Sequence, residues 1–185
     1  DKTWIAPQRQ WNQAIPPLDL DAGRYGWRRE GKAIVMESPT CRETQLKVIR
    51  RVELFANGDV SLDEKIVNVG KREAARGVWN VTQLMRPFDV YLPVALDDLR
   101  GYPDEGESVA IRDEILRAHD GWTCVPCREA RHFKYGGVAE RGVVVALRPR
   151  ADETVAHTRR FDLQPGAQFA HDSSVEVYNS PNHDY

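Results

Sequence analysis

The stretch from Gln45 to Val69, QLKVIRRVELFANGDVSLDEKIVNV, alternates apolar and charged residues on either side of an Asn57-Gly58 dipeptide. Alternation with a period of two is typical of a strand that buries one face. Asn-Gly supplies the positive φ angles that a two-residue type I′ turn requires. The stretch therefore predicts an antiparallel hairpin with the strands Gln45–Phe55 and Val60–Val69.

The predicted turn also determines which residues face each other across the hairpin. With Asn57 and Gly58 as the two loop residues, the opposed pairs are Phe55 with Val60, Arg51 with Glu64, and Ile49 with Ile66. Apolar pairs and opposite charges directly across an antiparallel ladder contribute about 0.2–1 kcal/mol each. Strands of this length suit a large sandwich.

Other short runs with strand patterns are separated by Gly, Pro or Asp/Asn clusters, as in all-β folds. They are Lys32–Met36, Val78–Leu84, Phe88–Leu92, Ala130–Tyr135, Gly142–Arg148, Val155–Leu163 and Val175–Tyr178. Val109–His119 fits either a helix or a strand, and the first thirty residues predict irregular structure rich in aromatic side chains. The sequence thus predicts an all-β fold, a large antiparallel β-sandwich with little helix and one short helix at most.

Composition narrows the class of protein. The chain has 185 residues, 41% of them hydrophobic and 29% charged, as in ordinary globular proteins, and this length predicts a single domain over residues 1–185. The 26 basic and 28 acidic side chains are interleaved, so we expect no nucleic-acid partner, because that requires a clustered basic surface. No apolar run approaches the roughly 20 residues of a membrane helix, so we expect no membrane partner.

Three cysteines, Cys41, Cys124 and Cys127, do not make a complete disulfide framework. Cys124-Val-Pro-Cys127 has the spacing of a redox motif or of half a zinc site. A structural zinc needs two further ligands, for which His132 is one candidate and a fourth is missing. We therefore expect structural thiols or a local disulfide, with no metal and no other cofactor; metal binding and redox chemistry are the less favoured alternatives.

Three stretches combine polar side chains with aromatic ones, the composition of a saccharide site. They are Asp1–Gln8 with Trp11, the segment GVWNVTQ at 77–83, and the segment HDSSVEVY at 171–178. Together with the hairpin and Asn68, these stretches resemble the galactose mutarotase-like (aldose 1-epimerase-like) superfamily, and nearly the whole chain is similar in element order. The resemblance implies a supersandwich, a sugar held in a cleft on the concave sheet face, and a chain that is a fragment of the full domain, truncated at both ends.

The resemblance also implies roles for individual residues. The substrate-binding candidates are Trp4, Gln8, Trp11, Trp79, Gln83 and Lys134, and the catalytic candidates are His132, His171 and Glu176. Mutarotation needs an acid and a base on opposite sides of the sugar. Where the family carries a sugar-binding histidine, this sequence has Val81-Thr82-Gln83, and a glutamine can hydrogen-bond but cannot titrate. Each candidate also has a structural interpretation, as a core tryptophan or a solvated strand residue.

Three functions are therefore open. The favoured one is a carbohydrate-binding protein; the alternatives are an aldose 1-epimerase-type or other carbohydrate-active enzyme, and a structural or interaction β domain, because this fold serves all of them. The residues leave open whether the chain is an enzyme. The resemblance implies a bacterial protein, with the periplasm or the extracellular space as the expected location.

Overall fold

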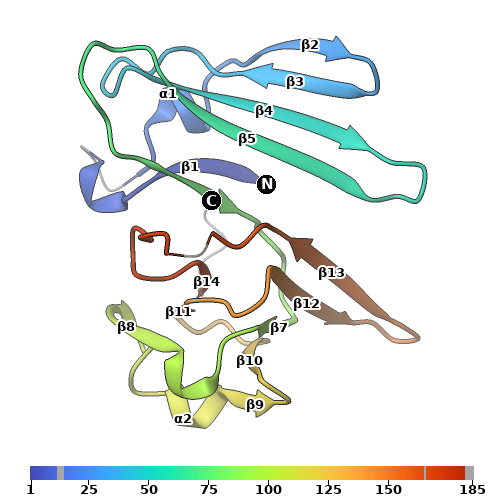
Figure 1. Cartoon of the computed structure of the whole chain (residues 1–185). Coiled ribbons are helices and arrows are strands. Elements are labelled where there is room, and N and C mark those ends of the chain that lie inside the picture. Colours follow the sequence, from blue (N-terminus) through green and yellow to red (C-terminus); the bar gives the residue numbers. More distant parts are fainter. Residues whose placement is uncertain (12–14, 165, 182–185) are drawn as a thin grey trace. The chain divides into compact units, whose positions relative to one another are not determined.

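The computed structural model describes residues 1–11, 15–164 and 166–181 (Figure 1). The chain divides into two compact units, Asp1–Gln83 (unit 1) and Leu84–Tyr185 (unit 2), which are described separately below. The described residues form fourteen strands in four antiparallel sheets and two short α-helices. The all-β class with little helix is thus confirmed.

Unit 1 is dominated by a four-stranded sheet in the order β2-β3-β4-β5 (Figure 1). Its strands are β2 (Gly26–Glu30), β3 (Ala33–Glu37), β4 (Leu46–Leu54) and β5 (Val60–Asn68). The last two are the predicted hairpin, which is therefore confirmed. At one end of this sheet, Leu46 and Val48 are fully buried in the core of unit 1.

The predicted register of the hairpin is wrong by one residue. Leu54 pairs with Val60, Arg51 with Asp63, Arg50 with Glu64, Ile49 with Lys65 and Val48 with Ile66. The turn explains the shift, because Phe55 N–H donates to the Asp59 carbonyl and leaves three residues in the loop. In this loop Gly58, with φ +87°, has positive φ and Asn57 does not. This is the pattern of a type I turn followed by a left-handed glycine, the common three-residue loop, rather than a type I′ turn.

A two-stranded ribbon completes unit 1. It pairs β1 (Lys2–Ala6) with β6 (Gly77–Val81), and Trp4 lies directly opposite Trp79. A 3-10 helix η1 (Gln8–Gln10) and the helix α1 (Leu18–Asp21) follow β1. The expectation of irregular structure over the first thirty residues is therefore wrong at β1, α1 and β2. In β1, Thr3 and Ile5 are buried, so this strand has the alternation that its short length concealed.

Unit 2 contains two further antiparallel sheets. The first has the order β13 (Thr154–Arg160), β12 (Val143–Pro149), β7 (Phe88–Leu92), β10 (Trp122–Cys127) and β9 (Arg117–His119). The second has the order β14 (Val175–Asn179), β11 (Phe133–Gly137) and β8 (Arg100–Gly106). A 3-10 helix η2 (Leu96–Asp98) and the helix α2 (Arg112–Ile115) lie in the connections.

The core of unit 2 lies between its two sheets. Val125 and Leu92 from the five-stranded sheet share one buried cluster with Phe133, Tyr135 and Val177 from the three-stranded sheet. Because side chains alternate along a strand, the residues between these core positions point to the outer faces. Unit 2 is thus a small β-sandwich, and its outer faces carry the polar residues discussed below.

Two details of the helix prediction need correction. The ambiguous segment Val109–His119 contains both alternatives, since the four residues of α2 are followed by the three-residue strand β9. The prediction of one short helix at most is wrong, because α1 is a second one. No helix among the described residues is long and apolar enough to cross a membrane.

Candidate functional site

The predicted site residues lie in both units. Trp4, Gln8, Trp11, Trp79 and Gln83 belong to unit 1, and His132, Lys134, His171 and Glu176 belong to unit 2. Each group is described within its own unit. They form two separate candidate sites, a tryptophan cluster and a polar cluster.

The tryptophan cluster consists of Trp4, Trp11 and Trp79. Trp4 and Trp79 are paired across the β1-β6 ribbon, and their ring centroids lie 5.5 Å apart at nearly a right angle. Trp11, which follows η1, packs edge-on to Trp4 at 5.8 Å and lies 6.1 Å from Trp79 at a tilt of 31°. All three residues are partly exposed. The three tryptophans that were predicted as substrate-binding candidates therefore lie together in unit 1.

Two of the indole N–H groups in this cluster have partners within unit 1. Trp4 Nε1 donates to Asp21 Oδ1 at 2.8 Å, and Trp11 Nε1 donates to the Ile5 carbonyl at 2.7 Å. Lys2 Nζ lies 2.9 Å from the other oxygen of Asp21. Asp21 was not predicted, because it lies on α1, within a segment expected to be irregular. The largely buried carboxylate of Asp21 lies beside the rings.

A second carboxylate, Glu64 of β5, lies against the opposite face of the ribbon. It accepts hydrogen bonds from Thr3 Oγ1 and from Asn80 Nδ2, the latter at 2.8 Å, and Arg50 Nε lies 3.4 Å away. Thr3 and Asn80 face each other across β1 and β6. This set joins the ribbon to the four-stranded sheet and fixes the strand that carries Trp4.

The two glutamine candidates lie at the ends of these elements. Gln8 begins η1 and is exposed, and its carbonyl accepts the backbone N–H of Trp11. Gln83 is also exposed and lies two residues after the end of β6. Both side chains are therefore accessible to a ligand.

The polar cluster of unit 2 lies on the outer face of the three-stranded sheet. Lys134 is on β11 and Glu176 on β14, and Lys134 Nζ lies 3.3 Å from Glu176 Oε2, with both side chains nearly buried. His171 Nδ1 lies 3.1 Å from Glu176 Oε1. Lys134, predicted as a substrate-binding residue, therefore meets the catalytic candidates His171 and Glu176 at one carboxylate.

Sequence reasoning missed Tyr102 and Ser173 in this cluster. Tyr102, on β8, donates to Glu176 Oε1 at 2.8 Å, and its hydroxyl lies 2.9 Å from Ser173 Oγ. Its ring also lies under the Lys134 ammonium, 4.6 Å from Nζ to the centroid. Nothing in the segment around Tyr102 marks it as part of a site, because the contact depends on the pairing of β8 with β11.

Hydrogen-bond donors and acceptors can be assigned in this cluster. An ionised carboxylate only accepts, so the Tyr102 hydroxyl and His171 Nδ1–H donate to Glu176, and Ser173 then donates to Tyr102. Burial, reinforced by the charge of Glu176, raises the pKa of Tyr102 to about 12, against a smaller lowering by Ser173. The phenol therefore stays protonated at neutral pH.

His132 is separate from this set. Its Nε2 lies 3.4 Å from Glu105 Oε2 and 3.3 Å from the Tyr178 hydroxyl, and its ring packs edge-on to Tyr178 at 5.5 Å. It precedes β11 on the same side as Lys134, as its alternation predicts.

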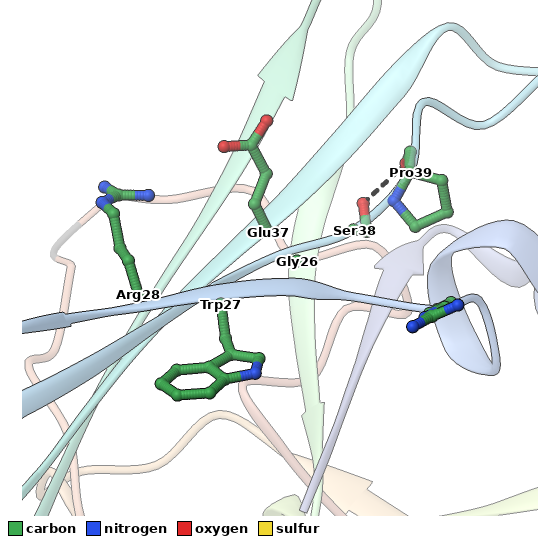
Figure 2. A pocket seen from close by; sticks show the side chains of 7 residues that line it. Gly26, Trp27, Arg28, Glu37, Ser38 and Pro39 are labelled. Atoms are coloured by element: carbon green, nitrogen blue, oxygen red, sulfur yellow. Dashed lines mark hydrogen bonds between the residues drawn. The ribbon is translucent and has the colours of Figure 1, made fainter.

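A further tryptophan, Trp27, lines a shallow hollow in unit 1. The hollow is lined by residues of β2, β3 and their flanking segments, namely Arg24, Gly26, Trp27, Arg28, Glu37, Ser38 and Pro39. Figure 2 shows the Trp27 indole on one side of β2, with Arg28 and Glu37 projecting on the other. Trp27 is 73% exposed, and it was not among the predicted site residues.

The two cysteines of the Cys-Val-Pro-Cys segment lie on different faces of β10. Cys127 belongs to the core cluster, whereas Cys124 lines a hollow on the outer side. All three cysteines are free and buried. Burial raises the pKa of both thiols, that of Cys127 to about 12. Over the residues that the structure describes, no group of three or more His, Cys, Asp or Glu side chains is placed to hold a metal ion.

No family model, no curated protein and no solved structure matches this chain. The resemblance to the galactose mutarotase-like superfamily therefore stays a prediction, and the chemistry of the two clusters must be argued from their geometry.

Proposed function

We propose that the chain is a noncatalytic saccharide-binding protein and that the tryptophan cluster of unit 1 is its contact surface. The observation that supports this proposal is the grouping of three partly exposed indole rings within 6.1 Å of one another, on a ribbon fixed by hydrogen bonds. Flat aromatic rings pack against the apolar faces of sugar rings. A few polar groups beside them then select particular hydroxyls.

The polar groups beside the rings suit this role. The Asp21 carboxylate is held by Trp4 and Lys2 at the edge of the cluster and can accept hydrogen bonds from hydroxyl groups. The exposed amide of Gln8 can both donate and accept. Rings that already contact each other are ordered before a ligand arrives, which lowers the entropic cost of binding.

The geometry of the polar cluster is the reason that we propose a noncatalytic role. Mutarotation needs an acid and a base on opposite sides of one sugar. His171 and Glu176 instead contact each other directly at 3.1 Å, and Tyr102 and Lys134 occupy the rest of the carboxylate. A sugar cannot lie between groups that are hydrogen-bonded to each other. The favoured role of this cluster is to order unit 2.

A glycan array tests the proposal without a prior guess about the sugar. We expect a saccharide that binds the whole chain and quenches its tryptophan fluorescence. Trp79→Leu should abolish both signals, whereas Trp122→Leu, which alters a tryptophan of unit 2, should preserve them. Melting curves must show that each variant is folded.

Two outcomes would contradict the proposal. One is a hit that survives Trp79→Leu and is lost in Trp27→Ala, which would place binding at the hollow of β2 and β3. The other is a rate of mutarotation well above buffer, measured by polarimetry on fresh α-glucose or α-galactose, that falls in His171→Ala or His132→Ala. That result would favour the aldose 1-epimerase alternative.

A further inference from the structure

A hollow of about 500 Å³ lies at the outer side of the five-stranded sheet in unit 2. It is lined by residues of β7, β9 and β10, by the end of α2 and by the segment after β10. Its volume is in the range of small-molecule sites. None of its lining residues belongs to the tryptophan cluster or to the polar cluster, so it is independent of the proposed function.

Strand pairing gathers a set of reactive and charged side chains in this hollow. Cys124 lies opposite Tyr91 on one side and opposite Arg117 on the other, so the three side chains emerge in one row. The Tyr91 side chain is therefore a direct cross-strand neighbour of the Cys124 thiol. His119, two residues after Arg117 on the same face of β9, packs its ring edge-on to Tyr91 at 6.4 Å.

Most charges of the lining are neutralised in pairs. Arg128 Nε donates to Asp89 Oδ1 at 2.7 Å and its Nη2 donates to Oδ2, which uses both oxygens of that carboxylate. Glu114 is paired with Arg131 at 2.7 Å.

The guanidinium of Arg117 is bound to the backbone instead. Its Nη1 donates a hydrogen bond to the Leu116 carbonyl, which uses one of its five N–H groups.

Cys124 lies beside this guanidinium, because the two residues are paired across β10 and β9. Burial is the largest influence on the pKa of the Cys124 thiol and raises it, whereas the charge of Arg117 lowers it. Glu129 is the remaining carboxylate of the lining.

The lining also offers hydrocarbon surface. Ile115 and Pro126 contribute aliphatic groups and Tyr91 contributes an aromatic ring, beside the charged pairs. An aromatic ring and a guanidinium in one hollow are suited to a ligand that joins a flat ring to an anionic group.

We propose that this hollow binds a small organic anion, a carboxylate carried on a flat unsaturated ring, with Arg117 contacting the carboxylate and Tyr91 the ring. A guanidinium matches the two oxygens of a carboxylate with parallel N–H groups. Cys124 lies beside the bound ring and reports on the site.

The first test uses Cys124 as the reporter in the native, full chain. The thiolate attacks 5,5′-dithiobis(2-nitrobenzoate), forms a mixed disulfide and releases one thionitrobenzoate, and mass spectrometry locates the labelled cysteine. The neutral reagent 4,4′-dithiodipyridine reacts by the same exchange but carries no carboxylate. We expect Arg117→Gln to lower the rate ratio of the anionic to the neutral reagent about tenfold, the effect of losing one charge-assisted hydrogen bond.

Arg150→Gln is the matched control, because Arg150 is an exposed arginine of unit 2 that pairs with Glu153 outside this hollow. It should leave the ratio unchanged. Benzoate should protect Cys124 from both reagents in the native chain and in the control, and not in Arg117→Gln. An unchanged ratio in Arg117→Gln would overturn the proposal.

A second readout covers the case in which Cys124 is too buried to react. Titration of ¹⁵N-labelled chain with benzoate should shift the amide signals of residues 117–119 and 124 in a saturable way. The shifts should disappear in Arg117→Gln and persist in Arg150→Gln. Shifts that are absent from the native chain, or that survive Arg117→Gln, would refute the site.

Discussion

Lys134 Nζ lies 3.3 Å from Glu176 Oε2, and the two side chains are only 7% and 10% exposed. An ion pair taken out of water in this way contributes little to stability in itself, because the loss of hydration offsets the attraction. Removing one partner is different, since it leaves an uncompensated charge in a nonpolar setting. Each of the two buried charges is therefore tolerated in the folded chain only while the other is present.

Lys134→Met should lower the free energy of unfolding by about 3–5 kcal/mol, because Glu176 is then buried without its cation. The double variant Lys134→Met/Glu176→Leu should be more stable than this single variant. Urea denaturation at neutral pH measures both. A single variant as stable as the native chain would show that the pair is hydrated in solution.

Gly136 provides the space that the polar cluster occupies. A Cβ atom at this position would lie 2.8 Å from both Ser173 Oγ and Tyr102 Oη, and 3.1 Å from Glu176 Cγ. Gly136→Ala should therefore destabilise the chain by about 1–3 kcal/mol through overpacking. Gly77→Ala is the control, because its Cβ would meet only Ala6 Cβ at 3.8 Å. Equal midpoints of the two variants in urea would contradict the tight packing.

The hairpin turn gives a prediction that depends on backbone conformation alone. Gly58 has φ +87° and no atom within 4 Å of a Cβ placed there, so a side chain meets no obstacle other than the dihedral angle. Gly58→Val should destabilise the chain by about 1 kcal/mol or more, since β-branched residues tolerate positive φ badly. Ala56→Val, in the same loop at negative φ, should have a smaller effect on the denaturation midpoint.

The turns also show how far the sequence predicts the fold. Asn57-Gly58 was interpreted as a two-residue type I′ turn, yet that turn is found at Asp120-Gly121, where both residues have positive φ and His119 pairs with Trp122. Asp-Gly is the same signal, but the flanking strand β9 is only three residues long, too short for an alternating pattern that would predict a hairpin. The hairpin was predictable from its alternation, but its register depended on one loop residue.

The candidate sites were predictable in part. Trp4, Trp11 and Trp79 were singled out by residue type, and the pairing of β1 with β6 brings them together. Lys134 and Glu176 were placed in different roles, because no local pattern shows that their strands are neighbours. Tyr102 and Asp21 could not be found, since each joins its cluster only through the packing of distant segments.

The chain should begin to lose stability at a lower alkaline pH than a domain that has no buried phenols or thiols. Burial raises the pKa of Tyr102 and Tyr135 from 10.0 to about 12, and that of Cys127 from 9.0 to about 12. Between these values the unfolded chain releases protons that the folded chain keeps, so stability falls as pH rises. The melting temperature should therefore change little between about pH 8 and pH 9 and fall between pH 9 and about 12. Tyr102→Phe should make this fall less steep; an identical slope would contradict the burial of that phenol.

The spacing of Cys124 and Cys127 predicts the redox behaviour of the chain. Residues three apart on a regular strand point to opposite faces, and here Cys127 lies in the core of unit 2 while Cys124 lines the outer hollow. A disulfide needs Cβ atoms about 3.5–4.5 Å apart and directed toward each other, so a bridge would require β10 to leave its pairing with β7 and β9.

We expect three free thiols per chain in protein prepared in air, counted by alkylation after denaturation without a reductant. Cys124→Ser should reduce the count to two and leave the fold intact, because its side chain lies on the outer face of β10 and not in the core cluster. A count of one in the native sequence would show that the pair is bridged and that β10 is not a regular strand in the oxidised chain.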